Sequence, residues 1–236
     1  MRFVAVKGID QQAAGMAFRT RDLFIRQKTQ TINALRGHLA ECGVIAPAGV
    51  ANLGRLVAVM QRADSGLPTE VIELARMLVD QIDELQLRID TLDRDIRKRA
   101  REDDVASRLM TIPGVGPICA SAMIALAPPA ESFARGRDFS AWLGLVPKQH
   151  SSGGKERLGR TSKMGQRDLR RLLITGAMAV VRWAALRGAR AGSWLEKMMI
   201  RKPRMLVAVA LANKMARIAW ALMAQGGVYP DPAAVA

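Results

Sequence analysis

The feature that most constrains the fold of this chain is a series of apolar residues at helical spacing between residues 69 and 96. The series comprises Val71, Leu74, Leu78, Ile82, Leu85, Ile89, Leu92 and Ile96. Its later gaps alternate between four and three residues, which places a heptad-like apolar seam along one long helix. Thr69 is the predicted N-cap, and Glu70 and Glu73 favour the positive end of the helix dipole. The seam requires a partner, so we predict an antiparallel helical hairpin or a contact with a second subunit.

A second long helix is predicted over residues 11–42, where Gly43 offers a stop. Its apolar positions are Phe18, Ile25, Ile32, Leu35 and Leu39. The opposite face carries Arg19, Arg21, Arg26, Lys28 and Arg36. Such a face is either solvated or a track along a phosphate backbone, and the pattern favours neither. This helix is the natural partner for the seam.

Composition supports a mainly all-α protein. Half of the 236 residues are apolar and only 4% are aromatic, while Ala, Leu, Met and Arg are abundant. These are good helix formers, and the length is sufficient for one large or two modest domains. We predict a long helical hairpin or coiled coil at residues 11–104. A compact helical domain follows at residues 105–227, with a tail at residues 228–236.

The charge balance favours a polyanionic partner. The formal net charge is +15 and the isoelectric point is near 11.1, which favours nucleic acid over a membrane surface because no basic stripe lies opposite large aromatics. Apolar stretches at residues 172–186 and 205–223 contain charged residues, so both are predicted to be buried helices and not membrane spans. Cys42 and Cys119 have no metal or redox spacing, which indicates a reducing, cytoplasmic location.

Residues 109–126 match a helix-hairpin-helix pattern, with the turn Ile112-Pro-Gly-Val-Gly116 between two helices. In such a motif, Gly114 and Gly116 allow backbone N–H groups to approach a phosphate at the N-terminus of the second helix. The alternative is a tight turn that only joins two packed helices.

Two adjacent serines, Ser151 and Ser152, precede two glycines in a strongly basic segment, which we predict to be a flexible Ser-Gly loop. The predicted nucleic-acid-binding cations are Lys148, Lys155, Arg157, Arg160, Lys163, Arg167, Arg170 and Arg171. A hydroxyl among cations suits attack on a phosphodiester, because the cations stabilise the charge that develops. His150 is a candidate general base by proximity. The alternative is a solvated loop.

The serine segment leads into a helix predicted over residues 168–186. Its inward residues are predicted to be Leu169, Leu172, Leu173, Val180 and Trp183. Arginines in its first turn oppose the helix dipole, which indicates an anion nearby. A basic connection then leads to a final helix over residues 205–224, which Pro203 starts and Gly226 stops.

Several segments together resemble DEDD-type insertion-sequence transposases of the IS one-ten family, in its IS eleven-eleven branch, with Piv-type DNA invertases as relatives. The resemblance rests on Ile112-Pro-Gly-Val-Gly116, Ala141-Trp-Leu-Gly-Leu-Val-Pro147, His150-Ser-Ser-Gly-Gly-Lys155, Gly159-Arg-Thr-Ser-Lys-Met-Gly165 and Leu169-Arg-Arg-Leu-Leu173. Residues 19–39 also resemble the central coiled coil of the family. The resemblance implies that Ser151 or Ser152 attacks DNA and forms a phosphoserine intermediate.

The resemblance further implies Mg²⁺ held by four acidic residues of an N-terminal ribonuclease-H-like domain. The stretch Met1-Arg-Phe-Val-Ala-Val-Lys7 resembles the end of that domain, and residues 1–10 are predicted to contain a remnant strand at Phe3–Val6. No convergent acidic set is evident in this chain, so we expect no metal bound by the chain alone. The expected protein is therefore a shortened transposase that is not fully active alone.

Two alternatives belong to other functional classes. One is a non-catalytic protein that bends or bridges DNA through the helix-hairpin-helix and the basic helices. The other is an RNA-binding module, since the resemblance implies a structured guide RNA in addition to the element ends and the target DNA. The long helices predict a homo-dimer, and joining two DNA partners favours a tetramer. All three functions predict steep salt dependence of binding.

Overall fold

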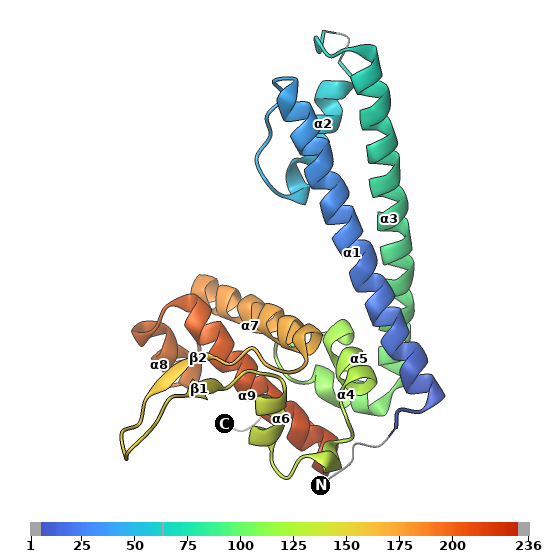
Figure 1. The fold of residues 1–236 in the computed structure, drawn as a ribbon. Helices are drawn as coiled ribbons and strands as arrows, with labels where there is room; N and C mark the ends of the chain where they lie inside the picture. Colours follow the sequence, from blue (N-terminus) through green and yellow to red (C-terminus); the bar gives the residue numbers. More distant parts are fainter. Residues whose placement is uncertain (1–5, 63, 231–236) are drawn as a thin grey trace. The chain divides into compact units, whose positions relative to one another are not determined.

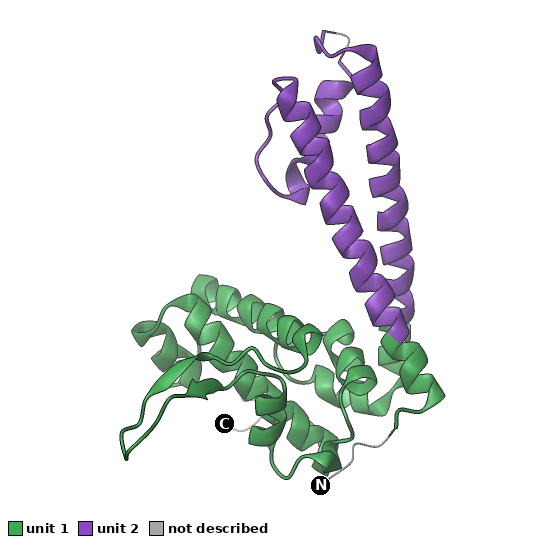
Figure 2. Cartoon of the chain, viewed as in Figure 1, with its two compact units in different colours: residues 1–15, 96–236 green, residues 16–95 purple. Residues whose placement is uncertain are grey.

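The computed structural model describes residues 6–62 and 64–230 and confirms a mainly helical protein. It divides into two compact units, residues 16–95 and residues 1–15 with 96–236 (Figure 2). The ends of the long helical hairpin therefore belong to the same unit as the C-terminal helices. Most of the predicted strand at Phe3–Val6 lies outside the described residues, and Val6 belongs to no regular element.

The unit at residues 16–95 is the predicted antiparallel hairpin (Figure 1). It is formed by most of α1 (Ile9–Glu41) and α3 (Thr69–Glu102), together with the short helices η1 (Val50–Asn52) and α2 (Leu53–Met60). Its buried core comprises Ile32, Leu35, Leu39, Leu56, Met60, Ala75 and Ile82. The apolar seam is thus covered within the chain. Thr69 is the first helical residue of α3 and not its N-cap, so the helix begins one residue earlier than predicted.

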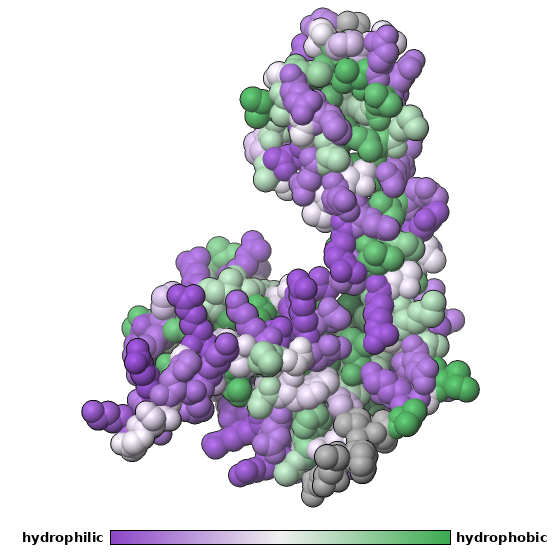
Figure 3. Space-filling model, viewed as in Figure 1, coloured by the Kyte–Doolittle hydropathy of each residue, from purple (hydrophilic) through white to green (hydrophobic). Residues whose placement is uncertain are grey.

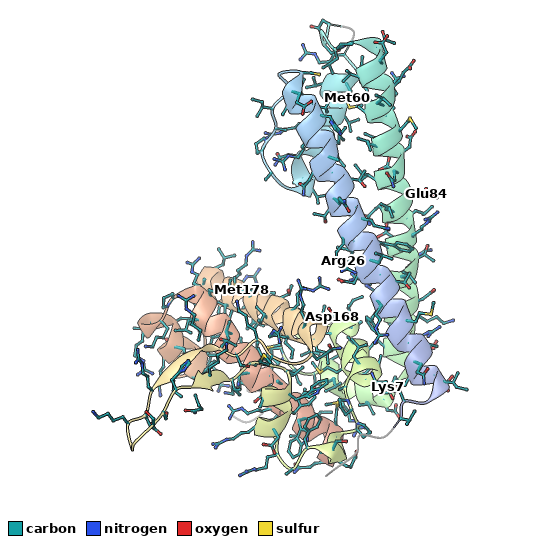
Figure 4. The ribbon with its side chains drawn as sticks, viewed as in Figure 1. Lys7, Arg26, Met60, Glu84, Asp168 and Met178 are labelled. Carbon is teal, nitrogen blue, oxygen red and sulfur yellow. The ribbon has the colours of Figure 1, made fainter. Side chains whose placement is uncertain are left out.

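Two cations of the predicted basic face on α1 contact α3. The Arg21 guanidinium is paired with the Asp93 carboxylate, and the Lys28 ammonium donates to Gln86 Oε1. Arg26, labelled in Figure 4, remains two-thirds exposed and is paired with Asp22 one turn earlier. The face therefore contributes to packing of the hairpin as well as to its surface.

The other unit is built around α9 (Arg204–Gln225). It also contains α4 (Asp104–Met110), α5 (Pro117–Leu126), η2 (Ala130–Ser132), α6 (Gly136–Trp142), β1 (Pro147–Gln149), β2 (Leu158–Thr161), α7 (Arg167–Arg187) and α8 (Trp194–Arg201). α9 packs against α4, α6, α7 and α8. Its buried face is mostly small: Val207, Ala208, Ala212, Met215, Ala216, Ala219 and Leu222. Small residues let the helix axes approach closely.

α9 is also the one described helix that is long and apolar enough to cross a membrane. Length and composition alone are weak evidence for a span, because the core helix of a folded domain meets the same criteria. α9 has a buried face that packs on its neighbours, as predicted for residues 205–223.

Three predictions about this unit are wrong. Residues 147–161 form a two-stranded antiparallel hairpin where we expected a loop. The basic connection, for which we expected no helix, contains α8. The N-cap of α8 is Ser193, whose hydroxyl accepts a hydrogen bond from Glu196 N at 3.2 Å, as in a helix-capping pattern. Trp183 is 58% exposed, not inward, and the Arg187 guanidinium lies 5.5 Å from its ring centroid.

The exposure of Trp183 follows from the periodicity of α7. Its buried residues are Leu169, Leu173, Ala177, Val181 and Ala184, at spacings of four and three. Two residues beyond Val181 corresponds to a rotation of about 200° around the helix, so Trp183 lies on the opposite face. A large apolar side chain does not by itself mark the buried face.

Candidate serine hairpin and cationic surface

The two serines lie at the tip of the β1–β2 hairpin (Figure 1). The strands pair with Pro147 opposite Thr161 and Gln149 opposite Leu158. The two turn residues, Gly153 and Gly154, have φ values of 57° and 78°, and Lys155 N donates to Ser152 O at 3.1 Å. Two successive positive φ values define the tight turn that suits the twist of a hairpin, and glycine adopts them at little cost.

The hairpin separates the two serines, which the sequence left equivalent. The Ser151 hydroxyl donates to Gln149 Oε1 at 3.0 Å and accepts from Arg157 N at 3.0 Å. Ser151 thus joins the two sides of the hairpin. The Ser152 side chain is exposed and makes no hydrogen bond with the described residues. Only the Ser152 hydroxyl therefore presents its oxygen without first breaking a contact that the hairpin uses.

His150 is anchored to the opposite strand. Its backbone N–H donates to Arg157 O at 2.9 Å, and its imidazole lies where a side chain on Gly159 would be, 2.6 Å from an added Cβ. The glycine at residue 159 thus leaves room for the imidazole ring in the position seen here. His150 is exposed, and its predicted role as a base stays a prediction.

The base of the hairpin is fixed by close backbone contacts with the end of α6. A Cβ on Gly144 would lie 2.0 Å from Met164 O, and a Cβ on Gly165 would lie 1.9 Å from Trp142 O. The Arg170 guanidinium donates to Leu143 O at 2.9 Å and to Met164 O at 3.0 Å. Arg170, predicted to bind nucleic acid, thus holds the hairpin against α6. The sequence offered only the glycines as a signal for this arrangement.

The remaining predicted cations lie along the hairpin and the segment that leads from it into α7. We call Lys148, Lys155, Arg157, Arg160, Lys163 and Arg167 the hairpin cations. All six are exposed, and none makes an ion pair or a side-chain hydrogen bond with a described residue. Arg171 is exposed as well. Residues 147–171 contain eight Lys and Arg against two acidic residues, Glu156 and Asp168. The visible surface over the hairpin is accordingly hydrophilic (Figure 3), and Asp168 lies at the start of α7 (Figure 4).

The predicted helix-hairpin-helix consists of α4, the turn at residues 111–116 and α5. Gly114, with φ 89°, packs on α7: a Cβ on Gly114 would lie 2.8 Å from Gly176 O. This contact and the positive φ account for the glycine at residue 114. Gly116 is the N-cap of α5, and a Cβ added there would meet no atom within 4 Å. The backbone at residue 116 is thus open to approach, and phosphate binding by either glycine stays a prediction.

The described part of the chain shows no cluster of metal ligands, and one of its two cysteines is buried. Its His, Cys, Asp and Glu residues form no group of three or more that could hold a metal ion. Burial in α5 raises the pKa of the Cys119 thiol to about 12, because desolvation disfavours the thiolate. Cys119 is therefore a packing residue. The residues described here do not fit the Mg²⁺ site that the family resemblance implies.

Comparison with known proteins places this chain among the transposases. Residues 106–191, which contain most of α4, the turn after it, α5, the serine hairpin and α7, match the sequence model of the transposase IS116/IS110/IS902 family. A Pseudomonas aeruginosa protein named "Probable family 20 transposase" is 45% identical over 231 residues, which cover 97% of this chain and 68% of that protein.

Two further relatives are named as transposases of particular elements. The transposase for insertion sequence element IS1328 of Yersinia enterocolitica is 35% identical over 97% of this chain and 68% of its own length. The transposase for insertion sequence element IS1111A of Coxiella burnetii is 33% identical over 97% of this chain and 63% of its own length. The chain belongs to the IS116/IS110/IS902 family of transposases, and it spans about two thirds of the length of these relatives.

Proposed function

We propose that this chain acts in the transposition of an insertion sequence, with Ser152 as the nucleophile that attacks a DNA phosphodiester. The observation that carries the proposal is the exposed Ser152 hydroxyl at the tip of the hairpin, which has no hydrogen-bond partner among the described residues. Lys155, whose backbone pairs with that of Ser152, and Arg157 follow it in the same hairpin and supply positive charge for a phosphate. Membership of the family supplies the biological process.

In the proposed step the Ser152 oxygen forms a new bond to phosphorus, and one ester oxygen of the attacked phosphodiester leaves with its bonding electrons. The serine proton passes, directly or through water, to the leaving oxygen, which becomes a free hydroxyl. The number of phosphoester bonds is unchanged, so attack by a second DNA hydroxyl can reverse the step and join new ends. Lys155 and Arg157, the cations nearest Ser152 along the hairpin, stabilise the additional negative charge on the phosphoryl oxygens.

Ser151 has a supporting role in this proposal. Its two hydrogen bonds tie Gln149 to Arg157 and so fix the direction of the hairpin tip. Arg170 and the two close glycines fix the base of the same hairpin. The family resemblance implies Mg²⁺, but the proposal assigns that metal no ligand among the described residues and routes no step through it.

The test is a denaturing gel for covalent protein–DNA adducts with element-end DNA and Mg²⁺. Two proteins are compared: this chain, and a chimera in which it replaces the matched region of the Pseudomonas aeruginosa relative. We expect that Ser152→Ala abolishes adducts in whichever protein forms them, whereas Ser151→Ala lowers their yield but leaves some. Adducts that survive Ser152→Ala but not Ser151→Ala would reverse the assignment.

A non-catalytic nucleic-acid-binding function is the second candidate, and the net charge of +15 favours it independently of the serines. It is the correct function if neither protein forms adducts although both bind DNA. Competition between duplex DNA and a structured RNA from the element then separates DNA binding from guide-RNA binding. Sedimentation with and without DNA tests the proposed dimer or tetramer.

A further inference from the structure

A cavity of about 480 Å³ lies in the C-terminal unit, away from the serine hairpin in sequence. It is open to solvent and is lined by the α4–α5 turn, α7, the start of α8, α9 and the segment after α9. Its apolar lining includes Val180, Leu211, Met215 and Ile218. Neither serine and none of the hairpin cations lines it, so the proposed reaction does not account for it.

Two aromatic side chains line this cavity at separate places. Trp194 begins α8 and is 36% exposed, and Lys214 Nζ lies 5.1 Å from its ring centroid. Tyr229 lies beyond the end of α9, where its backbone N–H donates to Thr111 Oγ1 at 2.9 Å. That hydrogen bond holds the segment after α9 on the α4–α5 turn. The cavity thus has flat ring surfaces held by two independent elements.

The charge of the lining is positive. Arg190 and Lys214 line the cavity, and none of the acidic residues that the structure describes does. Glu196, the acidic residue in the first turn of α8, accepts a hydrogen bond from Gly192 N at 2.6 Å, so its carboxylate is used in the turn before α8. A ligand that matches this lining has a flat apolar body and a negative group at one end.

We propose that this cavity binds an unpaired nucleobase of a DNA strand, with the base stacked on Trp194 and its phosphate at Lys214. The volume is in the range of small-molecule sites and is ample for one nucleotide. Aromatic rings accept any base by stacking, and cations bind the phosphate without regard to sequence. The choice of a DNA strand over a free nucleotide rests on the proposed function. The cavity itself is independent of the identity of the nucleophile.

The test compares two labelled duplexes of the same sequence, one fully paired and one with a single unpaired base. Fluorescence anisotropy gives the Kd of each for the intact chain. We expect roughly tenfold tighter binding of the duplex with the unpaired base, because stacking of one base on an aromatic ring contributes about that factor. Equal Kd values for the two duplexes would overturn the proposal.

Two variants of Trp194 test whether the preference for the duplex with the unpaired base arises at this ring. Trp194→Ala should remove the preference and leave the Kd of the paired duplex unchanged, while Trp194→Phe should retain most of it. The matched control is Trp183→Ala, because Trp183 is exposed and does not line the cavity. A loss of preference in the control, or its survival in Trp194→Ala, contradicts the assignment. Lys214→Gln tests the phosphate contact without deleting a ring and should reduce the preference severalfold.

A third measurement separates the two sources of a nucleotide. Free deoxyadenosine monophosphate is titrated as a competitor against the duplex with the unpaired base. Competition at concentrations at or below the Kd of that duplex would assign the cavity to a free nucleotide and overturn the proposal. The serine adduct assay is independent of this result. A failure of the cavity proposal therefore leaves the nucleophile untouched, and loss of adducts in Ser152→Ala says nothing about the cavity.

Discussion

Gly176 in α7 and Gly114 in the α4–α5 turn meet with no room for a side chain on either residue. A Cβ on Gly176 would lie 2.0 Å from Gly114 O, which is backbone and cannot turn away. Gly114 also has φ 89°, a conformation that other residues adopt at a cost. The pair lets the proposed helix-hairpin-helix lie directly on the helix that follows the serine hairpin.

We predict that Gly176→Ala destabilises the protein, although alanine normally favours a helix interior by about 1 kcal/mol over glycine. The clash should outweigh this gain and give a net loss of about 2 kcal/mol or more. The matched control is Gly37→Ala in α1, where an added Cβ meets no atom within 4 Å. The control should gain up to about 1 kcal/mol. Urea unfolding of both variants measures the two signs, and a stabilised Gly176→Ala would contradict the close contact.

The serines show what residue types alone can and cannot indicate. Two adjacent hydroxyls in a basic segment indicated a candidate nucleophile, but adjacent positions on a chain carry no information about hydrogen-bond partners. Ser151 is engaged by Gln149 and Arg157 only because the chain reverses at Gly153 and Gly154. The sequence likewise did not distinguish Arg170 from the other cations, because the carbonyl groups that it binds belong to residues 143 and 164, which are not adjacent to it in the chain.

At the scale of elements, the start of α7 combines one charge that favours the helix dipole, that of Asp168, with charges that oppose it. Arg167 and Arg171 lie in its first turns, and the N-cap Gln166 forms no side-chain cap. Cations at a helix N-terminus oppose the helix dipole, whereas a bound phosphate relieves that repulsion. The sequence predicted this conflict correctly because it depends only on order along the chain.

We predict opposite effects of Arg167→Glu on folding and on DNA binding. The free protein should gain about 0.5 kcal/mol, since a carboxylate complements the helix N-terminus. DNA binding should weaken, and the salt slope should fall by about one because one phosphate contact is lost. Arg182→Glu is the control, because Arg182 is exposed in the middle of α7. It should leave stability nearly unchanged. Thermal melting and salt-dependent binding test the pair, and a destabilised Arg167→Glu would refute the dipole argument.

Short elements without an apolar pattern were the least predictable. The long helices α1, α3, α7 and α9 have repeated apolar spacing and were predicted to within a few residues. The strands β1 and β2 are three and four residues long and mostly exposed, so they have no apolar alternation to detect. α8 has eight residues and no buried side chain. Its only signal in the sequence was the N-terminal pair Ser193 and Glu196, within a segment whose main feature is its positive charge.

At the scale of the whole molecule, the chain forms two compact units that share the ends of two helices. Each unit has its own core. Leu35 and Leu39 are buried in the helical hairpin, and Leu169, Leu173 and Ala212 are buried in the C-terminal unit. Because the cores are separate, we expect that a substitution that removes buried side-chain volume from one core destabilises that unit more than the other.

We predict that Leu35→Ala destabilises the unit at residues 16–95 by about 2–5 kcal/mol, as large-to-small changes at fully buried sites do. Hydrogen exchange followed by mass spectrometry should show faster exchange in that unit and little change in α7 and α9. The reciprocal variant Leu173→Ala should show the reverse pattern. Equal acceleration throughout the chain in both variants would mean that the two units unfold as one.

The sequence by itself determined the helical class, the long hairpin and the cationic character of residues 147–171. Helical periodicity and charge are properties of order along the chain, so they can be counted without coordinates. Only the tertiary structure decided that Ser152, of the two adjacent serines, has no hydrogen-bond partner among the described residues, that Arg170 holds the hairpin against α6 and that Trp194 and Tyr229 line one cavity. These facts depend on contacts between residues up to 118 positions apart, such as Tyr229 with Thr111. Chain order places no constraint on such pairs until the helices have packed.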